Sequence, residues 1–150
     1  MDYKRLSMAA VVAWIVDSIY GYLVYGVMMR EEFAKYPGVF RTEEALDANL
    51  PLLLGGTLLG LLAMTYIYAK GYEGGSGLQE GLRFGIVFGI FMFGMVSIGS
   101  YVVYNFGRRL ALYLAVGGFI ETIIDGIVIG FLYRPPQTKA VTGQRRAVAV

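Results

Sequence analysis

Four long apolar stretches dominate the sequence and restrict the environments in which it can fold. They cover residues 8–29, 50–69, 82–104 and 110–133, and short polar segments separate them. An α-helix needs roughly 20 apolar residues to cross about 30 Å of hydrocarbon. Because soluble domains interrupt their apolar runs every few positions, we predict an all-α protein: an integral membrane, antiparallel four-helix bundle.

Composition agrees with this prediction. Hydrophobic residues make up 57% of the chain and charged residues 16%, and the mean hydropathy is +0.58. The chain has no cysteine and no histidine, which removes thiol chemistry and the commonest ligands of haem and zinc. We therefore expect no cofactor and no metal site. The net charge of +2, with no basic patch outside the C-terminal tail, gives no reason to expect nucleic-acid binding.

The domain organisation follows from the same stretches. We expect residues 1–134 to form one membrane domain and residues 135–150 to form a basic cytoplasmic tail. Lys4 and Arg5 precede the first stretch, but its apolar run exceeds the roughly 7–15 residues of a signal-peptide core, so we expect an uncleaved span.

Lysine and arginine near the ends of the predicted spans indicate the orientation, because cytoplasmic loops are enriched in both. An N-terminus inside the cell places these residues in the cytoplasm: Lys4, Arg5, Lys70, Arg83, Arg134, Lys139, Arg145 and Arg146. It places these outside: Arg30, Lys35, Arg41, Arg108 and Arg109. The bias predicts that both termini are cytoplasmic.

The connecting segments carry helix-start signals. Thr42, followed by two glutamates, is typical of an N-cap and predicts a short surface helix that Pro51 kinks into the second span. Ser76 and Gln79 have the spacing of a capping box, so the third span is expected to begin there. Short connections predict that spans two and three, and spans three and four, are antiparallel neighbours.

Small residues recur at four-residue spacing in every span. The first span carries Ala9, Ala13, Asp17 and Gly21; the second Gly56 and Gly60; the third Gly81, Gly85 and Gly89; the fourth Gly118, Thr122, Gly126 and Gly130. Such stripes drive association in lipid because they let helix backbones approach closely. They predict a compact bundle with all four helices in contact. Alternatively, the stripe of the third span faces a second copy of the chain.

Several segments together resemble a group of small bacterial four-span inner-membrane proteins. They are MDYKRL at the start, YPGVF in the first loop and AKGYEGGSGLQEGLRFG at the second loop. The resemblance covers most of the chain and contains no catalytic signature. It implies a four-span fold in the bacterial inner (cytoplasmic) membrane and implies no activity.

Three carboxylates lie at mid-membrane depth in the predicted spans. They are Asp17 in the first span and Glu121 and Asp125 in the fourth, where four-residue spacing puts the last two on one face. No lysine, arginine or histidine lies at the same depth, and a lone charge there costs roughly 2.5–3.5 kcal/mol on insertion scales. We predict that the three acids converge inside the bundle and that at least one is protonated at neutral pH.

The acids admit three interpretations. In the first, they are neutral groups that hydrogen-bond between helices, with Ser18 and Thr122 among the supporting hydroxyls. In the second, they bind and release protons or a cation. In the third, a partner subunit supplies the missing positive charge. The corresponding functions are a non-enzymatic homo-oligomer or accessory subunit of a membrane complex, and alternatively a proton- or cation-coupled transporter or channel. A membrane enzyme has little support, because no nucleophile or oxyanion donor accompanies Glu121 and Asp125.

Overall fold

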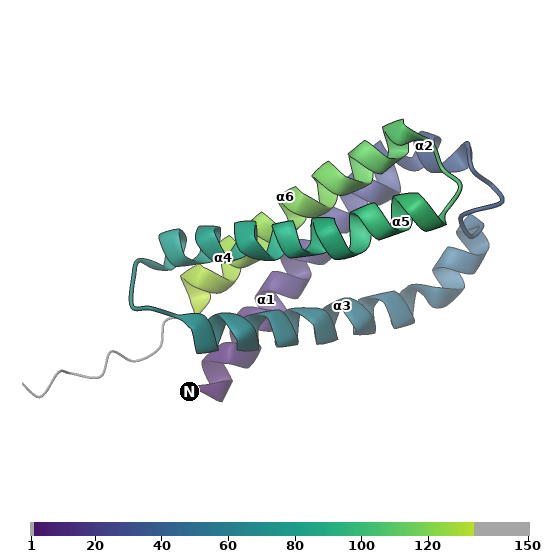
Figure 1. The fold of residues 1–150 in the computed structure, drawn as a ribbon. Coiled ribbons are helices and arrows are strands. Elements are labelled where there is room, and N and C mark those ends of the chain that lie inside the picture. The colour runs from purple at the N-terminus through teal and green to yellow at the C-terminus, as the bar shows by residue number, and fades with distance from the viewer. Residues whose placement is uncertain (1, 134–150) are drawn as a thin grey trace, which may run out of the picture.

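The structure is a computed structural model that describes residues 2–133, and it is helical through nearly all of them (Figure 1). Its elements are α1 (Tyr3–Gly21), the π-helical segment η1 (Tyr22–Met28), α2 (Arg30–Ala34), α3 (Glu43–Gly71), α4 (Gly77–Met92), the π-helical segment η2 (Phe93–Ser97), α5 (Ile98–Val103) and α6 (Arg108–Leu132). Within residues 2–133 there is no strand, so the predicted all-α class is confirmed. The predicted tail, residues 135–150, lies outside the described residues.

Four helices are long and apolar enough to cross a membrane, as predicted: Tyr3–Met28, Glu43–Gly71, Gly77–Val103 and Arg108–Leu132. The first three begin five to seven residues before the predicted apolar stretches, because their first turns are polar. The start signals are confirmed: the Thr42 hydroxyl accepts a hydrogen bond from the Ala45 amide, and the Ser76 hydroxyl accepts one from Gln79, each at 3.3 Å. N-cap side chains satisfy amides that have no partner within the helix.

The region around Pro51 differs from the prediction. A separate surface helix with a join at Pro51 was expected, but one helix runs from Glu43 through Pro51 to Gly71. Proline lacks an amide hydrogen and removes one backbone hydrogen bond. The loss of this one bond does not interrupt the helix, and one turn earlier the Asn49 side chain donates to the Ala45 carbonyl at 2.7 Å.

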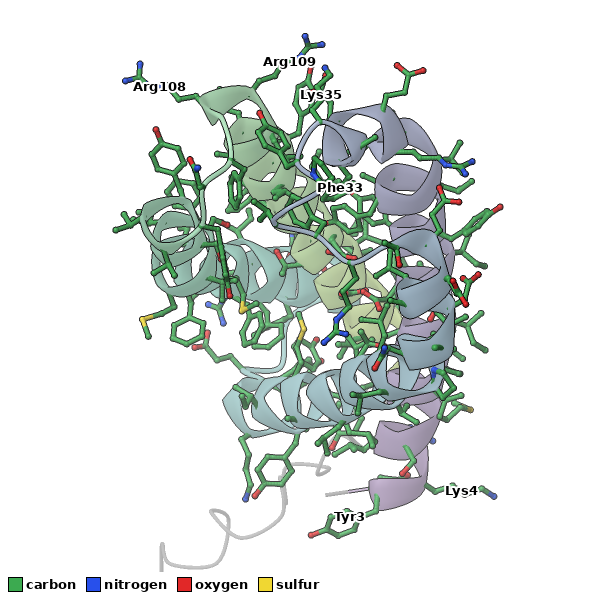
Figure 2. All side chains as sticks on the ribbon, turned by 90° about the vertical axis from the view of Figure 1, so that its right-hand side faces the viewer. Tyr3, Lys4, Phe33, Lys35, Arg108 and Arg109 are labelled. Atoms are coloured by element: carbon green, nitrogen blue, oxygen red, sulfur yellow. The ribbon has the colours of Figure 1, made fainter. Side chains whose placement is uncertain are left out.

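The helices pack in the spatial order α4, α6, α1 and α3. Central α6 packs along α4 on one side and α1 on the other, and α3 packs mainly along α1 (Figures 1 and 2). The prediction of antiparallel neighbours holds for spans three and four. It does not hold for spans two and three. Although a short turn joins these two spans, they do not pack along each other, and they meet only near the turn, where the centroids of the Tyr68 and Phe84 rings lie 5.4 Å apart.

The two ends of the bundle differ. The terminal face holds Tyr3, the end of α6 and the turn 72–76, and the loop face holds residues 29–42 and 104–107 (Figure 2). The apolar core lies toward the terminal face and consists of Leu6, Ala9, Ala13, Leu61, Met64, Tyr68, Ile129 and Tyr133. The half of the bundle near the loop face has no comparable core cluster among the described residues.

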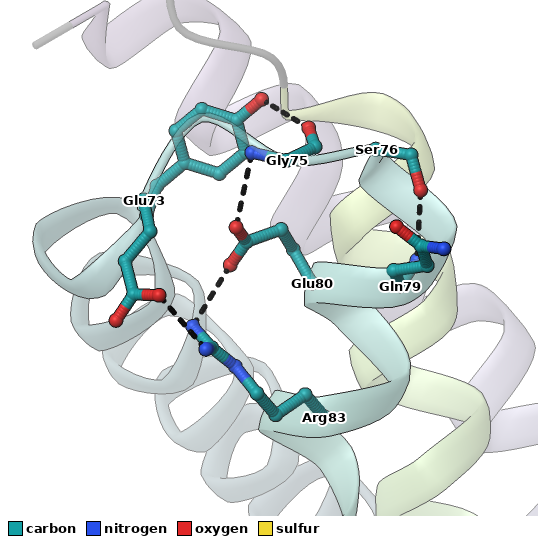
Figure 3. Close-up of polar contacts among 7 residues, drawn as sticks. Glu73, Gly75, Ser76, Gln79, Glu80 and Arg83 are labelled. Atoms are coloured by element: carbon teal, nitrogen blue, oxygen red, sulfur yellow. Dashed lines mark hydrogen bonds and ion pairs between the residues drawn. The ribbon is translucent and has the colours of Figure 1, made fainter.

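A network of polar contacts closes the turn at the terminal face (Figure 3). Arg83 contacts Glu73 at 2.8 Å and Glu80 at 3.2 Å, and the Gly75 amide donates to Glu80 at 3.0 Å. The bond from Arg83 lowers the pKa of Glu73. Because both acids pair with Arg83, these contacts stabilise the turn and the start of α4, and the arginine is not a free cationic site.

At the loop face, Glu32 links α2 to the start of α6. Its carboxylate lies 2.6 Å from the Lys35 ammonium and 3.4 Å from the Arg109 guanidinium, which Figure 2 shows at the same end of the bundle. Tyr36 packs against Gly107, so the first loop covers the second. The longest connection is thus fixed to the rest of the bundle.

Candidate functional site

The packing of α1 against α6 brings the three predicted acids together in the middle of the bundle. The Asp17, Glu121 and Asp125 carboxyl groups are close enough to influence one another electrostatically. Their convergence follows from the predicted stripes, because Asp17 continues the series Ala9 and Ala13, whose side chains are fully buried against the neighbouring helices.

Glu121 has a tyrosine partner. The Tyr25 hydroxyl, from η1, donates a hydrogen bond to Glu121 Oε2 at 2.8 Å. The neighbouring Tyr20 hydroxyl donates to the Gly117 carbonyl of α6 at 2.8 Å. Two tyrosines of the first span, Tyr20 and Tyr25, are therefore hydrogen-bonded to α6 next to the acids.

Sequence reasoning did not single out Tyr25, although a signal was present. The four-residue series Ala9, Ala13, Asp17 and Gly21 reaches Tyr25 at its next step. Gly21 keeps this approach open, since a Cβ placed on it lies 3.9 Å from both Glu121 Oε1 and the Tyr25 ring. From the sequence, Tyr25 was one of several aromatic residues deeper in the first span and was interpreted as a packing residue, so its specific role was not predicted.

Asp125 is the most buried of the acids, with 4% of its surface exposed. Within residues 2–133, its Oδ1 atom and the Ser18 hydroxyl have no hydrogen-bond partner. A buried carboxylate oxygen without a donor is costly, whereas a protonated carboxyl carries less charge to solvate. The burial of Asp125 thus favours its neutral form.

The predicted supporting hydroxyls do not bond to the acids. Thr122 donates to the Phe119 carbonyl of its own helix at 2.9 Å, and Ser18 is unbonded among the described residues. Threonine often bonds to a carbonyl one turn earlier because the geometry is available without any neighbour. Tyr25 takes the role expected of these two residues.

No ion pair to Asp17, Glu121 or Asp125 occurs within residues 2–133. In the same part of the chain, no three acidic side chains are grouped closely enough to hold a metal ion. Neighbouring carboxyl groups without a basic partner disfavour simultaneous ionisation, so their proton steps are coupled. The arrangement is therefore suited to holding and sharing protons.

The predicted packing glycines lie between α4 and α6 of the same chain. A Cβ placed on Gly85 lies 2.7 Å from the Thr122 carbonyl oxygen, and one on Gly126 lies 2.7 Å from the Gly85 Cα. Gly81 and Gly130 show the same close approach, and Gly89 contacts the side chains of Thr122 and Phe119. The stripe of the third span thus packs within the protomer and not on a second copy.

Gly118 differs from the rest of its predicted stripe. A Cβ placed on it has the Tyr25 hydroxyl as its nearest neighbour at 3.8 Å, so α4 does not approach α6 there. Beside it lies a cavity of about 290 Å³, between η2 and α5 on one side and α6 on the other. Glu121, Thr122 and Tyr25 line the deep end of the cavity, and Phe106 lines the end at the loop face.

No protein-family model, curated protein or solved structure matches this chain. Its function is therefore inferred from the geometry of the described residues.

Proposed function

We propose that this protein is a non-enzymatic, multi-pass membrane protein that binds protons at Asp17, Glu121 and Asp125 and couples their exchange to the movement of a small solute or ion. The observation that carries this proposal is the gathering of Asp17, Glu121 and Asp125 between α1 and α6 without an ion pair to any of them among the described residues. Such a cluster retains a proton in the membrane interior, because two adjacent bare charges there are unfavourable.

The position of the cluster supports transport over a purely structural role. Glu121 lies at the end of a cavity, so its proton can exchange when that cavity hydrates. An asparagine or glutamine provides interhelical hydrogen bonds without a charging cost, and such bonds contribute only about 0.6 kcal/mol on average in membrane interiors. Three carboxyl groups at one depth are better explained by proton exchange.

The test is flux in proteoliposomes. Glu121→Gln and Asp125→Asn should fold normally and abolish the dissipation of an imposed pH gradient. Infrared spectroscopy should show the band of a protonated carboxyl group in the native chain and its loss in the variant. Unchanged flux in both variants, or the absence of any protonated carboxyl band, would refute the proposal.

A second function, as a homo-oligomer or accessory subunit of a larger membrane complex, is favoured by α3. A Cβ placed on Gly55, Gly56 or Gly60 has no neighbour within 4 Å, so this small-residue face has no partner within residues 2–133. Gly56→Leu and Gly60→Leu should reduce the native mass in mild detergent, whereas Val102→Leu, on an exposed part of α5, should not. A monomeric mass for the native chain would exclude self-association.

We also propose that the protein resides in the bacterial inner membrane with both termini in the cytoplasm, because the described basic residues and those of 134–150 favour that side. A reporter that is active only in the cytoplasm, fused after Val150, should be active. Activity of a periplasmic reporter at that position would reverse the orientation.

A further inference from the structure

The cavity between η2, α5 and α6 combines one carboxyl group with an aromatic wall. Its apolar lining includes Met92, Phe93, Val96, Phe106 and Phe119. Its one carboxyl group is that of Glu121, which accepts the hydrogen bond of Tyr25, and Ser97 and Ser100 add hydroxyl groups along the opposite wall. Among the described residues no lysine or arginine lines it, so the negative charge that Glu121 gains when it ionises has no basic partner in the cavity.

We propose that this cavity binds a small amphipathic organic cation, with its charged group against Glu121 and its apolar part against Phe93 and Phe119. The proposal rests on the carboxyl cluster of the proposed function, since Glu121 belongs to both. An anion is repelled by Glu121, and a purely apolar ligand gains nothing from it. A cation with apolar substituents satisfies both the carboxylate and the aromatic faces.

The size of the cavity limits the ligand. Pockets for drug-sized molecules measure about 300–1,000 Å³, so a cavity of about 290 Å³ accepts a compact ligand, such as one aromatic ring with a small substituted ammonium group.

The cavity is reached from the side and not from the loop face. At the loop face Phe106 is 8% exposed and packs among the rings of Phe40, Tyr101 and Tyr104. At the side, Phe93 and Val96 of η2 are 44% and 48% exposed, on a helix that crosses the membrane. A ligand that partitions into lipid reaches the carboxyl group by this route, which agrees with an amphipathic cation.

Both π-helical segments border this site. The η2 segment supplies Phe93, Val96 and Ser97, and η1 supplies Tyr25. Single π-helical turns inside α-helices are rare and occur frequently at functional sites. Both π-helical segments of the described residues supply lining residues of this cavity, although α6, which supplies the most, has none, and their position is a further reason to assign a ligand to it.

Binding of the cation exchanges charge with a proton. The protonated Glu121 carboxyl releases its proton to water, and the carboxylate then pairs with the cation, so net charge is conserved. The titratable groups that face Glu121 are Asp17 and Tyr20 of α1, Tyr25 of η1 and Asp125 of α6, while α4, η2 and α5 present hydroxyls and apolar groups there. Affinity should consequently increase as pH rises.

The test is calorimetric titration of the full chain in nanodiscs with benzyltrimethylammonium, compared with its uncharged isostere neopentylbenzene. Empty nanodiscs measure partitioning into lipid. The cation should bind saturably with release of protons, and Glu121→Gln should weaken it by at least about tenfold, because a buried charge pair loses one partner. The isostere should bind both proteins equally.

Two further variants keep the test decisive if Glu121→Gln does not fold. Ala115→Phe fills the cavity and should abolish binding of both ligands, whereas Val102→Phe, at a residue that is 76% exposed and outside the cavity, should change neither. Phe93→Leu should lower the affinity for the cation by roughly twofold to fivefold and leave the affinity for the isostere unchanged. Cation binding that survives Ala115→Phe, or no saturable binding to the native chain, overturns the cation site.

The outcomes also separate this site from the proposed function. If the carboxyl band is present but no cation binds, the proton proposal stands and the cation site fails. If the cation binds with an affinity independent of pH and releases no proton, the site stands and proton coupling fails.

Discussion

The two halves of the contact between α6 and the helix formed by α4, η2 and α5 differ sharply. Toward the terminal face, Gly81 and Gly85 lie against Gly126 and Gly130, and the backbones touch. Toward the loop face, a Cβ placed on Gly94 or Gly99 has no neighbour within 4 Å, and a cavity separates the helices. The same pair of helices, both rich in glycine, thus packs tightly at one end and loosely at the other.

Spacing explains the difference. Gly81, Gly85 and Gly89 are four residues apart, which turns each about 40° from the last and keeps them on one face. Gly94 and Gly99 follow at intervals of five, in and after the π-helical segment η2, and do not continue this four-residue series. Glycine permits close approach, but the approach occurs only where the glycines of both helices share a face.

The largest effect is expected from alanine at Gly126, compared with alanine at Gly118 on the same stripe of α6. The new Cβ of Gly126→Ala lies 2.7 Å from the Gly85 Cα, so the backbones must separate, at a cost of about 1–3 kcal/mol. Gly118→Ala meets only ordinary contacts and gains up to about 1 kcal/mol of helix propensity. Thermal unfolding in mild detergent measures both.

Equal effects at the two positions would show that the tight and loose halves are not distinct. Gly99→Ala provides the matched control on the other helix, because open space surrounds that position and it should tolerate the change.

A smaller effect is expected from Tyr25→Phe, which removes the bond of 2.8 Å that joins η1 to Glu121 beside the loose half. Hydrogen bonds in membrane interiors average about 0.6 kcal/mol, so the melting temperature should fall slightly. The infrared band of the Glu121 carboxyl should shift, because its hydrogen-bond partner is lost. Tyr22→Phe, at an exposed residue of η1, should change neither; a carboxyl band identical in both variants would contradict the bond.

The tight half could be predicted from the sequence, and the loose half could not. Hydropathy summed over long stretches identifies the spans, and local hydrogen bonds at Thr42 and Ser76 fix helix starts, so both follow from neighbouring residues. The four-residue spacing also identified the packing glycines of α4 and α6, although it left open whether the stripe of the third span faces α6 or a second copy. The convergence of Asp17, Glu121 and Asp125 followed from their depth and spacing.

The π-helical segments, the cavity and the hydrogen bond of Tyr25 depend on how whole helices are placed. A π-helical turn has no composition signal of its own, because its geometry is set by the packing of the surrounding helix. Ser18 and Thr122 were predicted to bond to the acids because they are adjacent to them in the sequence. In the structure Thr122 bonds to the Phe119 carbonyl of its own helix, and the partner of Glu121 is Tyr25 from another helix. Sequence spacing orders residues along one helix and gives no information on the separation between two.

The smallest effect concerns the loop face, where Glu32 holds α2 against the start of α6. The hydrogen bond from Lys35, with the charge of Arg109, lowers the pKa of Glu32. A lowered pKa in the folded state means that this contact stabilises the loop above the ordinary glutamate range, and that the stabilisation is lost as pH falls through the lowered pKa. Hydrogen exchange of the α2 amides should accelerate over that interval.

Glu32→Gln should make exchange in α2 fast at all pH values, with no such transition. Glu31→Gln, at the adjacent exposed residue, should retain the native pH profile, which corrects for the intrinsic dependence of exchange on pH. The effect should be modest and weaken with salt, since both cationic partners are exposed. If lowering the pH instead accelerates hydrogen exchange in η1 and α6 before α2, the prediction is wrong. The loose half is then stabilised by its carboxyl groups and not by the loop that covers it.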